Sequence, residues 1–181
     1  KINSAWVIGY GKINFLSGML SIYPEAKIYS INLSEVLIHD YLILKKYNIL
    51  NEESICVVEK EEDLLKPGIK LFLIPHDNSE ILKNNRIDLF VNFSSFQEMK
   101  FSDIENYFDI VKSNKSYLYT CNRYHKILPA GEVLNFNDYP WGDGSKIFFE
   151  KCEWISKYYS FKYPFFYNYD GDHWHCLISY E

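Results

Sequence analysis

Short apolar runs alternate with amphipathic segments along the first half of the chain, and this order predicts parallel strands joined by helices. The apolar run at residues 5–8 precedes a glycine turn and a helical pattern at 15–23, capped by Asn14 and ended by Pro24. A strand at 27–31 precedes a second helix at 35–47, expected to be capped by Ser34. Such a βαβα order is typical of a doubly wound, Rossmann-like α/β sheet. The apolar face of the second helix is expected to hold Leu37, Ile38, Tyr41, Leu42 and Leu44.

The stretch at residues 87–99 reads as a buried strand whose carboxyl end opens into a polar loop. Ser102 followed by Glu105 has the spacing of a capping box, so a helix is expected to begin at Ser102. Its apolar positions are Ile104, Tyr107, Phe108 and Val111. Ligands of open α/β sheets bind at the carboxyl ends of strands. We therefore expect the strands at 5–8 and 89–91 to lie side by side, with their carboxyl ends framing a hollow.

Further strands are predicted at residues 55–58, 69–74 and 116–121, with a brief helix at 79–83. Phe148, Cys152, Ile155 and Tyr159 recur at helical spacing, which predicts a helix at 145–159. The segments 163–167 and 173–180 are predicted to form an antiparallel hairpin that closes the sheet.

Composition narrows the class of protein. The 181 residues fit a single domain, and the net charge of −5 argues against a nucleic-acid partner. There is no apolar run of membrane-spanning length and no basic-then-apolar leader, so a cytoplasmic protein is expected. The four cysteines have no paired spacing and are expected to be free thiols. The chain begins at Lys1 almost directly in a strand, which suggests that an upstream region is missing.

The turn Gly9-Tyr10-Gly11 between a strand and a helix is where a nucleotide-type cofactor needs close backbone approach. A dinucleotide fingerprint would place a third glycine at Asn14, and the chain has no Walker lysine motif. A plain glycine turn without a ligand explains the same residues equally well.

Three strings together reach a family resemblance. They are VIGYG at residues 7–11, SINLSEVL at 30–37 and DLFVNFSSFQEM at 88–99. With the strand end Cys121-Asn122-Arg123, they make the chain similar to the sugar O-methyltransferases, which belong to the class I S-adenosylmethionine-dependent methyltransferases.

The resemblance implies a sheet whose last strand is antiparallel, with S-adenosylmethionine over the glycine turn. The expected cofactor-binding residues are Gly9, Tyr10, Gly11, Asn32, Leu33, His76, Asp77 and Asn92. Two positions depart from such enzymes: Val7 and Ile8 stand where an acidic residue often precedes the turn, and Asn32 replaces an aspartate expected on the ribose. An amide binds a hydroxyl more weakly than a carboxylate does.

Methyl transfer to a sugar hydroxyl needs a group that accepts the hydroxyl proton. The candidates are Glu98, which follows the strand facing the methyl group, and His173. Capping of backbone amides is an alternative role for Glu98. The expected acceptor-binding residues are Ser95, Asn122, Arg123 and His125. A divalent metal held by His173, His175 and Asp170 or Asp172 is possible, but the pair of histidines alone does not support one.

Three functions remain open. The first is methylation of a sugar hydroxyl in surface-glycan synthesis. The second is a non-catalytic binding or scaffolding module, which Val7 and Asn32 favour. The third is a nicotinamide-dependent dehydrogenase or epimerase. This chain lacks the third glycine of the dinucleotide fingerprint and the acidic residue after the second strand that such enzymes use.

Overall fold

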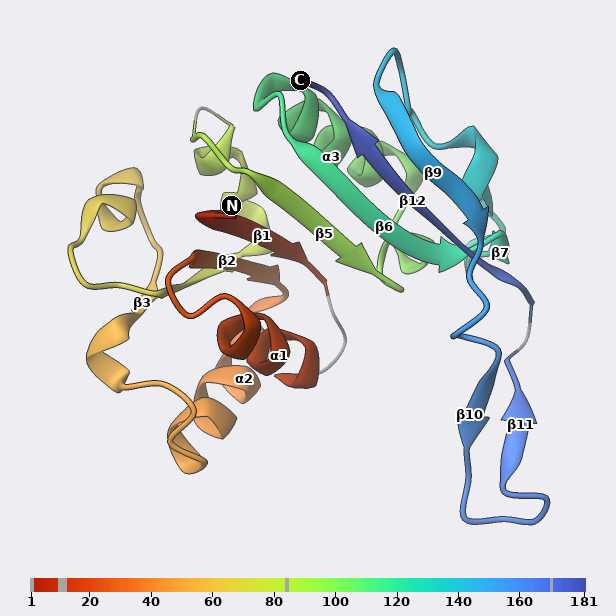
Figure 1. Ribbon diagram of the computed structural model, residues 1–181, viewed down its shortest axis with the longest axis horizontal. Coiled ribbons are helices and arrows are strands. Elements are labelled where there is room, and N and C mark those ends of the chain that lie inside the picture. Colours follow the sequence, from red (N-terminus) through yellow and green to blue (C-terminus); the bar gives the residue numbers. More distant parts are fainter. Residues whose placement is uncertain (1, 10–12, 84, 170) are drawn as a thin grey trace.

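The fold is an eight-stranded, mostly parallel sheet with helices on both faces (Figure 1). In this computed structural model the described residues are 2–9, 13–83, 85–169 and 171–181. The strands of the sheet, in their spatial order, are β3 (Ile55–Val57), β4 (Leu71–Pro75), β2 (Lys27–Asn32), β1 (Ser4–Ile8), β5 (Leu89–Phe93), β6 (Tyr117–Arg123), β12 (His173–Ser179) and β9 (Ser145–Lys151). β12 runs antiparallel to both of its neighbours, β6 and β9, whereas the other neighbouring strands of this sheet pair in parallel. The predicted fold class is therefore confirmed, including the antiparallel strand near the end of the chain.

The sheet reverses its direction of winding between β1 and β5. From β1 the chain moves outward to β2 and then to the edge strand β3, and β4 is inserted between β3 and β2. The chain then returns to place β5 on the other side of β1. β1 pairs with β5 in parallel, with Ile8 opposite Asn92. The predicted adjacency of these two strands is confirmed, and it creates the switch point at which α/β sheets bind ligands.

Helices cover the two faces unequally (Figure 1). α1 (Ile13–Ile22) and α2 (Ser34–Lys46) pack on one face against the β1, β2 and β4 half of the sheet. α3 (Phe101–Ser113) packs on the other face, where Trp6 and Phe90 lie in the same core as its buried residues. The predicted apolar face of α3 is confirmed: Ile104, Tyr107, Phe108 and Val111 are all buried.

The helix starts differ from the predicted caps. α3 begins at Phe101 with Lys100 in the cap position, and α2 begins at Ser34 with Leu33 before it; neither cap makes a side-chain hydrogen bond. Asn14 lies inside α1. The capping box predicted at Ser102 was therefore wrong, because the cap position, Lys100, lies two residues earlier. Sequence spacing marks the first turn of a helix, whereas extended backbone at the preceding residue decides where the helix begins.

The apolar face predicted for α2 was partly wrong. Leu37 and Leu44 are buried, but Ile38 and Leu42 are 62% and 57% exposed. The same helix buries Asp40 completely. The helix is therefore turned so that a narrower stripe than the sequence indicated faces the sheet.

Short 3-10 helices connect several strands. They are η1 (Glu52–Ser54), η2 (Glu61–Leu65), η3 (His76–Leu82), η4 (Phe96–Glu98) and η5 (Phe136–Asp138). η3 replaces the brief helix predicted at residues 79–83 and begins directly after β4.

The segment after β6 departs most from the prediction. The helix predicted at residues 145–159 does not form, because 145–151 is the strand β9, which pairs along β12. Cross-strand pairing thus overrides a helical spacing of apolar residues. The predicted hairpin partner was also wrong: β11 (Phe166–Asn168) pairs with β10 (Lys157–Tyr159) in a separate ribbon, while β12 pairs with β6 and β9. A second small ribbon joins β7 (His125–Ile127) and β8 (Val133–Asn135).

Candidate functional site

A cavity of about 500 Å³ opens at the carboxyl ends of β1, β2, β4 and β5. This volume lies within the range of small-molecule sites. Its lining residues are Gly9, Ile31, Asn32, Leu33, His76, Ser94, Ser95, Glu98, Met99, Lys100, Asp103 and Tyr107. Six of the predicted site residues therefore meet in one place: Gly9, Asn32, Leu33, His76, Ser95 and Glu98.

Gly9 closes β1 in a conformation that only glycine adopts easily. Its φ is +51°, and its N–H donates to the carbonyl of Ile31 across the strand end at 3.0 Å. A Cβ at this position would lie 2.4 Å from Ser95 Oγ. The glycine is thus required by both backbone angle and packing. The other two residues of the predicted turn, Tyr10 and Gly11, lie outside the described residues.

The loop after β5 is fixed to β1 by buried polar side chains. Asn92 is fully buried in β5; its amide nitrogen donates to the carbonyl of Ile8 at 3.0 Å and also to Ser95 Oγ. The Ser95 hydroxyl donates to the same Ile8 carbonyl at 3.0 Å. Asn92 is therefore inside the sheet rather than in the cavity, because β5 extends two residues beyond the predicted end.

A second layer of this network ties the loop to β6. Asn122, also fully buried, donates to Asn92 Oδ1 at 2.8 Å and accepts from the backbone N–H of Gln97 at 3.2 Å. Gln97 Oε1 in turn accepts from the backbone N–H of Arg123 at 2.7 Å. The string Asn-x-x-Ser-x-Gln-Glu-Met thus builds a rigid loop that holds Ser94, Glu98 and Met99 at the cavity.

Asn32 ends β2 at the cavity with an incompletely satisfied amide. Its Oδ1 accepts from the N–H of Leu33 at 3.1 Å, and its buried Nδ2 has no hydrogen-bond partner among the described residues. A buried polar atom without a partner is costly, so a site of this kind favours a ligand that supplies one. Val7 and Ile8 have apolar side chains that are buried in the sheet. The end of β1 therefore has no carboxylate beside Asn32.

The opposite wall comes from η3 and α3. His76 Nδ1 lies 2.7 Å from the hydroxyl of Tyr107, which is 2% exposed. Burial, reinforced by nearby Asp103, raises the pKa of Tyr107, so its hydroxyl stays neutral. Asp103 and Tyr107, four residues apart on α3, both line the cavity. Neither residue was predicted to belong to the site, although their i, i+4 spacing places them on one face of the helix.

Glu98 lies at the rim. Its side chain is 52% exposed, and its Oε1 lies 3.1 Å from Lys126 Nζ on β7. This half-exposed pair leaves the second carboxylate oxygen free of any ion pair described in the structure.

The remaining predicted site residues lie away from the cavity lining. Asp77 is exposed, and His125 binds Asn135 Oδ1 at 2.8 Å on the β7–β8 ribbon. Arg123 ends β6 without lining the cavity. His173 begins β12 and is 3% exposed; burial and neighbouring Arg123 lower its pKa, against an opposing effect of Asp172.

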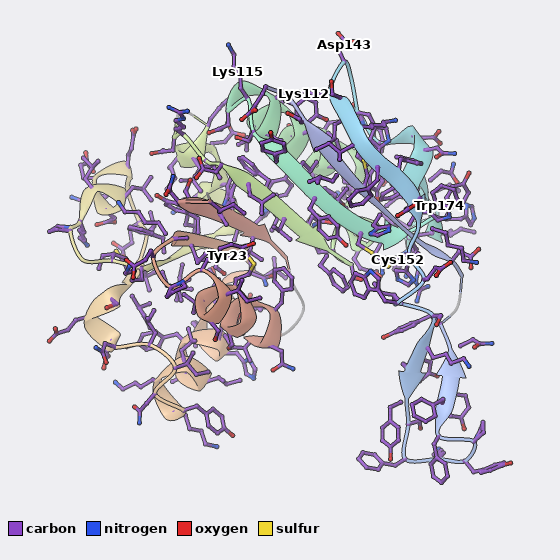
Figure 2. The ribbon with its side chains drawn as sticks, in the orientation of Figure 1. Tyr23, Lys112, Lys115, Asp143, Cys152 and Trp174 are labelled. Carbon is purple, nitrogen blue, oxygen red and sulfur yellow. The ribbon has the colours of Figure 1, made fainter. Side chains whose placement is uncertain are left out.

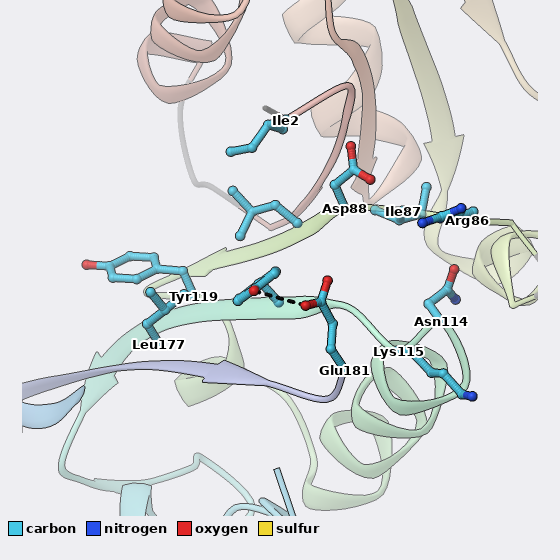
Figure 3. Close-up of a pocket in the computed structure, with 11 residues that line it drawn as sticks. Ile2, Arg86, Ile87, Asp88, Asn114, Lys115, Tyr119, Leu177 and Glu181 are labelled. Carbon is cyan, nitrogen blue, oxygen red and sulfur yellow. Dashed lines mark hydrogen bonds between the residues drawn. The ribbon is translucent and has the colours of Figure 1, made fainter. Parts of the chain in front are cut away.

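A slightly larger cavity of about 570 Å³ lies at the opposite, amino edge of the sheet (Figure 3). Its carboxylates are already engaged by the protein. Asp88 accepts from the backbone N–H groups of Asn3 and Ser4 at 2.6 and 3.1 Å, and Glu181 accepts from the Tyr117 hydroxyl at 3.1 Å. These carboxylates therefore serve the strand connections, and the carboxyl-edge cavity, which lies at the switch point of the sheet, is the better candidate site.

The described part of the chain contains neither a metal-binding cluster nor a membrane-spanning helix. No group of three or more His, Cys, Asp or Glu side chains lies close enough there to hold a metal ion. None of the helices in these residues is long and apolar enough to cross a bilayer.

Comparison with known proteins defines the fold. Protein families and curated proteins give no match to the sequence. Among solved structures, the mitomycin 7-O-methyltransferase MmcR is 8% identical with a TM-score of 0.58, and the match covers 98% of this chain and 49% of MmcR. TrmK from M. capricolum, solved with S-adenosylhomocysteine, is 13% identical with a TM-score of 0.53, and the match covers 99% and 62%.

A third similar structure is a SAM-dependent methyltransferase from Aquifex aeolicus, 11% identical with a TM-score of 0.51, for which the match covers 98% of this chain and 82% of the other. The chain thus has the fold of the class I S-adenosylmethionine-dependent methyltransferases. It spans about half the length of MmcR and about three fifths of TrmK.

Proposed function

We propose that the protein is an S-adenosylmethionine-dependent O-methyltransferase that acts on a sugar hydroxyl in surface-glycan synthesis. The observation that carries the proposal is the switch-point cavity, in which the Gly9 turn, the end of β2 and the loop after β5 converge. The methyltransferase fold of the similar structures supports the cofactor, and the resemblance of the three sequence strings supports the acceptor.

The cavity residues fit this cofactor chemically. The side-chain nitrogen of Asn32, which has no partner among the described residues, suits a ribose hydroxyl, and Leu33 supplies apolar surface beside it. His76, held by the buried Tyr107, suits the adenine at the loop after β4. Asp77 lies next in sequence at the outer side of that loop and is assigned a secondary contact. The carboxylates of Asp103 and Glu98 suit the cationic groups of the cofactor or the acceptor.

The protein's part in catalysis would be positioning and proton removal. S-adenosylmethionine supplies an activated methyl group on its sulfonium. An alcohol is a weak nucleophile until its proton is removed, and Glu98 at the rim is the cavity carboxylate best placed to accept that proton. The hydrogen bonds of Ser95 with Asn92 and with the Ile8 carbonyl hold the loop that carries Glu98. Ser95 and the buried Asn122 are assigned supporting roles in fixing this loop. Arg123, His125 and His173, which lie outside the cavity lining, are assigned acceptor-side roles.

A non-catalytic binding module is the second candidate. It is favoured by Val7, Ile8 and Asn32, which leave the ends of β1 and β2 without a carboxylate. A nicotinamide-dependent enzyme is the third, with the same sheet but no acidic residue after the second strand.

Titration calorimetry with S-adenosylmethionine, S-adenosylhomocysteine and NAD separates these candidates. We expect binding of the first two and not of NAD. Binding of NAD alone would support the dehydrogenase, and the absence of all binding would refute a cofactor site. Turnover is then tested with a panel of free hexoses, nucleotide sugars and neutral and acidic oligosaccharides. Glu98→Gln is expected to lower the rate at least about 100-fold, the scale of losing a general base, with S-adenosylhomocysteine affinity unchanged. Binding without turnover on any sugar would favour the non-catalytic module.

A further inference from the structure

A two-stranded ribbon stands away from the main sheet and exposes an unusual number of aromatic rings (Figures 1 and 2). We call residues 156–169, which contain β10 and β11, the arm. Eight of its fourteen residues are aromatic. Phe161 and Tyr163 at its tip are 91% and 84% exposed. Isolated two-stranded ribbons are marginally stable, and exposed aromatic patches mark binding surfaces, so the arm has the character of a ligand-binding element.

The two faces of the arm differ in chemistry. The β10–β11 register pairs Tyr158 with Tyr167 and Tyr159 with Phe166, so alternation sends these pairs to opposite faces. One face, the tyrosine face, consists of Tyr158, Tyr167 and Tyr169, with the rings of Tyr158 and Tyr167 stacked at 5.6 Å. The other, the phenyl face, consists of Tyr159, Phe161 and Phe166.

The tyrosine face leads back to the carboxyl edge of the sheet. The Tyr169 ring stands edge-on to the His173 ring at 5.5 Å. His173 is 3% exposed, and its Nδ1 has no hydrogen-bond partner in the part of the chain that the structure describes. The arm therefore begins at the edge of the sheet on which the candidate cavity lies.

Aromatic rings also continue from the arm toward the cavity. Trp154, just before the arm, is 60% exposed and stacks on Phe93 at 5.3 Å with an interplanar angle of 22°. Phe93 in turn stacks on Phe15 of α1 at 6.2 Å. Phe93 directly precedes Ser94, which lines the cavity. A chain molecule lying along these rings would reach the cavity rim.

The charge of the arm is opposite to that of the whole chain. Lys157 and Lys162 are the only charged residues in the arm, whereas the chain carries a net charge of −5. By the alternation along β10, Lys157 lies on the side of the phenyl face, so the positive charge belongs to the arm as a whole. The arm offers ring faces for stacking, hydroxyls for hydrogen bonds and charge for an anion. Sugar rings with carboxylate groups match all three features.

We propose that the arm binds an acidic glycan through its tyrosine face and presents it to the cavity; this substrate class rests on the proposed sugar methylation. The arm lysines attract the carboxylates, and the rings of Tyr158, Tyr169 and Trp154 support the sugar rings. The acceptor is thus a polymer or oligomer rather than a free monosaccharide.

Affinity electrophoresis through gels containing polygalacturonate tests this proposal, with dextran as the neutral polysaccharide. The whole protein is expected to be retarded by polygalacturonate and much less by dextran. Tyr158→Ala/Tyr167→Ala should weaken the retardation about tenfold, the scale of losing a stacked ring. The matched pair Tyr159→Ala/Phe166→Ala removes the neighbouring cross-strand pair on the phenyl face and should change it less than about twofold. Lys157→Gln/Lys162→Gln should weaken it and reduce its salt dependence.

Several results would overturn the proposal. They are the absence of retardation, equal retardation by dextran, equal effects of the two face variants, and tighter binding to poly(U) RNA in the same gels. Formation of a dimer that only the phenyl-face variant disrupts would instead make the arm an interface between two copies. Melting temperatures of the variants exclude unfolding as the cause. Calorimetry with S-adenosylhomocysteine is independent of the arm, so a failed cofactor site and a failed glycan site are distinguishable.

Discussion

The two edges of the sheet carry cavities of similar size but opposite character. At the amino edge, Asp88 and Glu181 are occupied by backbone amides and by the Tyr117 hydroxyl. At the carboxyl edge, the side-chain nitrogen of Asn32 lacks a partner in the described chain, and a glycine with positive φ brings the backbone to the cavity. Size alone would select the amino edge. Asn114 Oδ1, which belongs to the lining of the amino-edge cavity, also has no partner among the described residues. The difference teaches that a constrained backbone at the switch point of the sheet, rather than volume or a single unsatisfied polar atom, identifies a binding site.

The largest expected effect comes from the network behind the carboxyl-edge loop. Asn92→Leu removes the hydrogen bonds to the Ile8 carbonyl and Ser95 and leaves the buried Asn122 with fewer partners. We expect the free energy of unfolding to fall by about 3 kcal/mol, measured by urea denaturation.

Tyr117→Phe is the matched change at the amino edge, where it removes one exposed hydrogen bond to Glu181. It should cost less than about 1 kcal/mol. If Asn92→Leu and Tyr117→Phe lowered the free energy of unfolding equally, the proposed difference between the two edges of the sheet would be wrong.

Gly9→Ala tests the turn itself. The new Cβ would be placed at positive φ and would collide with Ser95 Oγ, so the backbone must move. The left-handed conformation alone costs roughly 1–2 kcal/mol. We expect S-adenosylhomocysteine to bind about 30-fold more weakly by calorimetry, which is about 2 kcal/mol.

Gly18→Ala serves as the control glycine, because a Cβ on Gly18 in α1 meets nothing within 4 Å. It should leave the affinity unchanged and add about 0.5–1 kcal/mol of stability. If Gly9→Ala bound S-adenosylhomocysteine as tightly as the unchanged protein does, the glycine turn would not be part of the cofactor site.

Asn32→Asp is expected to raise the affinity for S-adenosylhomocysteine, whereas Gly9→Ala lowers it. A carboxylate at this position can still accept from Leu33 N–H and offers a charge-assisted acceptor to a ribose hydroxyl. We expect the affinity for S-adenosylhomocysteine to rise about tenfold, or about 1.4 kcal/mol. Asn32→Leu, which removes both groups, should lower it. A rise in both variants, or in neither, would exclude Asn32 from ribose binding.

The smallest expected effect is on stability at acidic pH and comes from His173, whose ring contacts Tyr169 of the arm. Burial and Arg123 lower the folded-state pKa of His173, so below its ordinary pKa the unfolded chain binds a proton that the folded chain does not. Stability is therefore lost as the pH falls below about 6.5. In His173→Phe this contribution disappears, and denaturation midpoints of the two proteins should diverge only on the acid side. Divergence above pH 7 would contradict a neutral, buried histidine.

Much of the first half of the fold could be predicted, because helix and strand patterns there agree with local pairing. The strands around Val7, Ile31 and Val91 and the apolar face of α3 follow directly from the sequence. After β6 the pattern misleads: Phe148 and Cys152 fit a helix, yet long-range pairing with β12 makes a strand. Spacing along one segment contains no information about a partner strand that comes later in the chain.

The candidate site could be predicted in part, because residues that follow parallel strands meet at one edge of the sheet. Gly9, Asn32, His76 and Glu98 follow strand ends, and they do meet at the cavity. Asn92 and Asn122 follow the same rule, yet they are fully buried and bind each other. Sequence position cannot distinguish an amide that faces a ligand from one that fixes the loop beneath it. Tyr107 was expected only in the core, because its aromatic ring fits the buried stripe of α3.

A crystal structure of the protein with S-adenosylhomocysteine tests the central claim most directly. The account predicts the ligand at the carboxyl edge, over Gly9, with its ribose against Asn32 and its adenine near His76. Ligand density at the amino edge beside Asp88 and Tyr117, or a carboxyl-edge cavity that stays empty at saturating ligand, would contradict it.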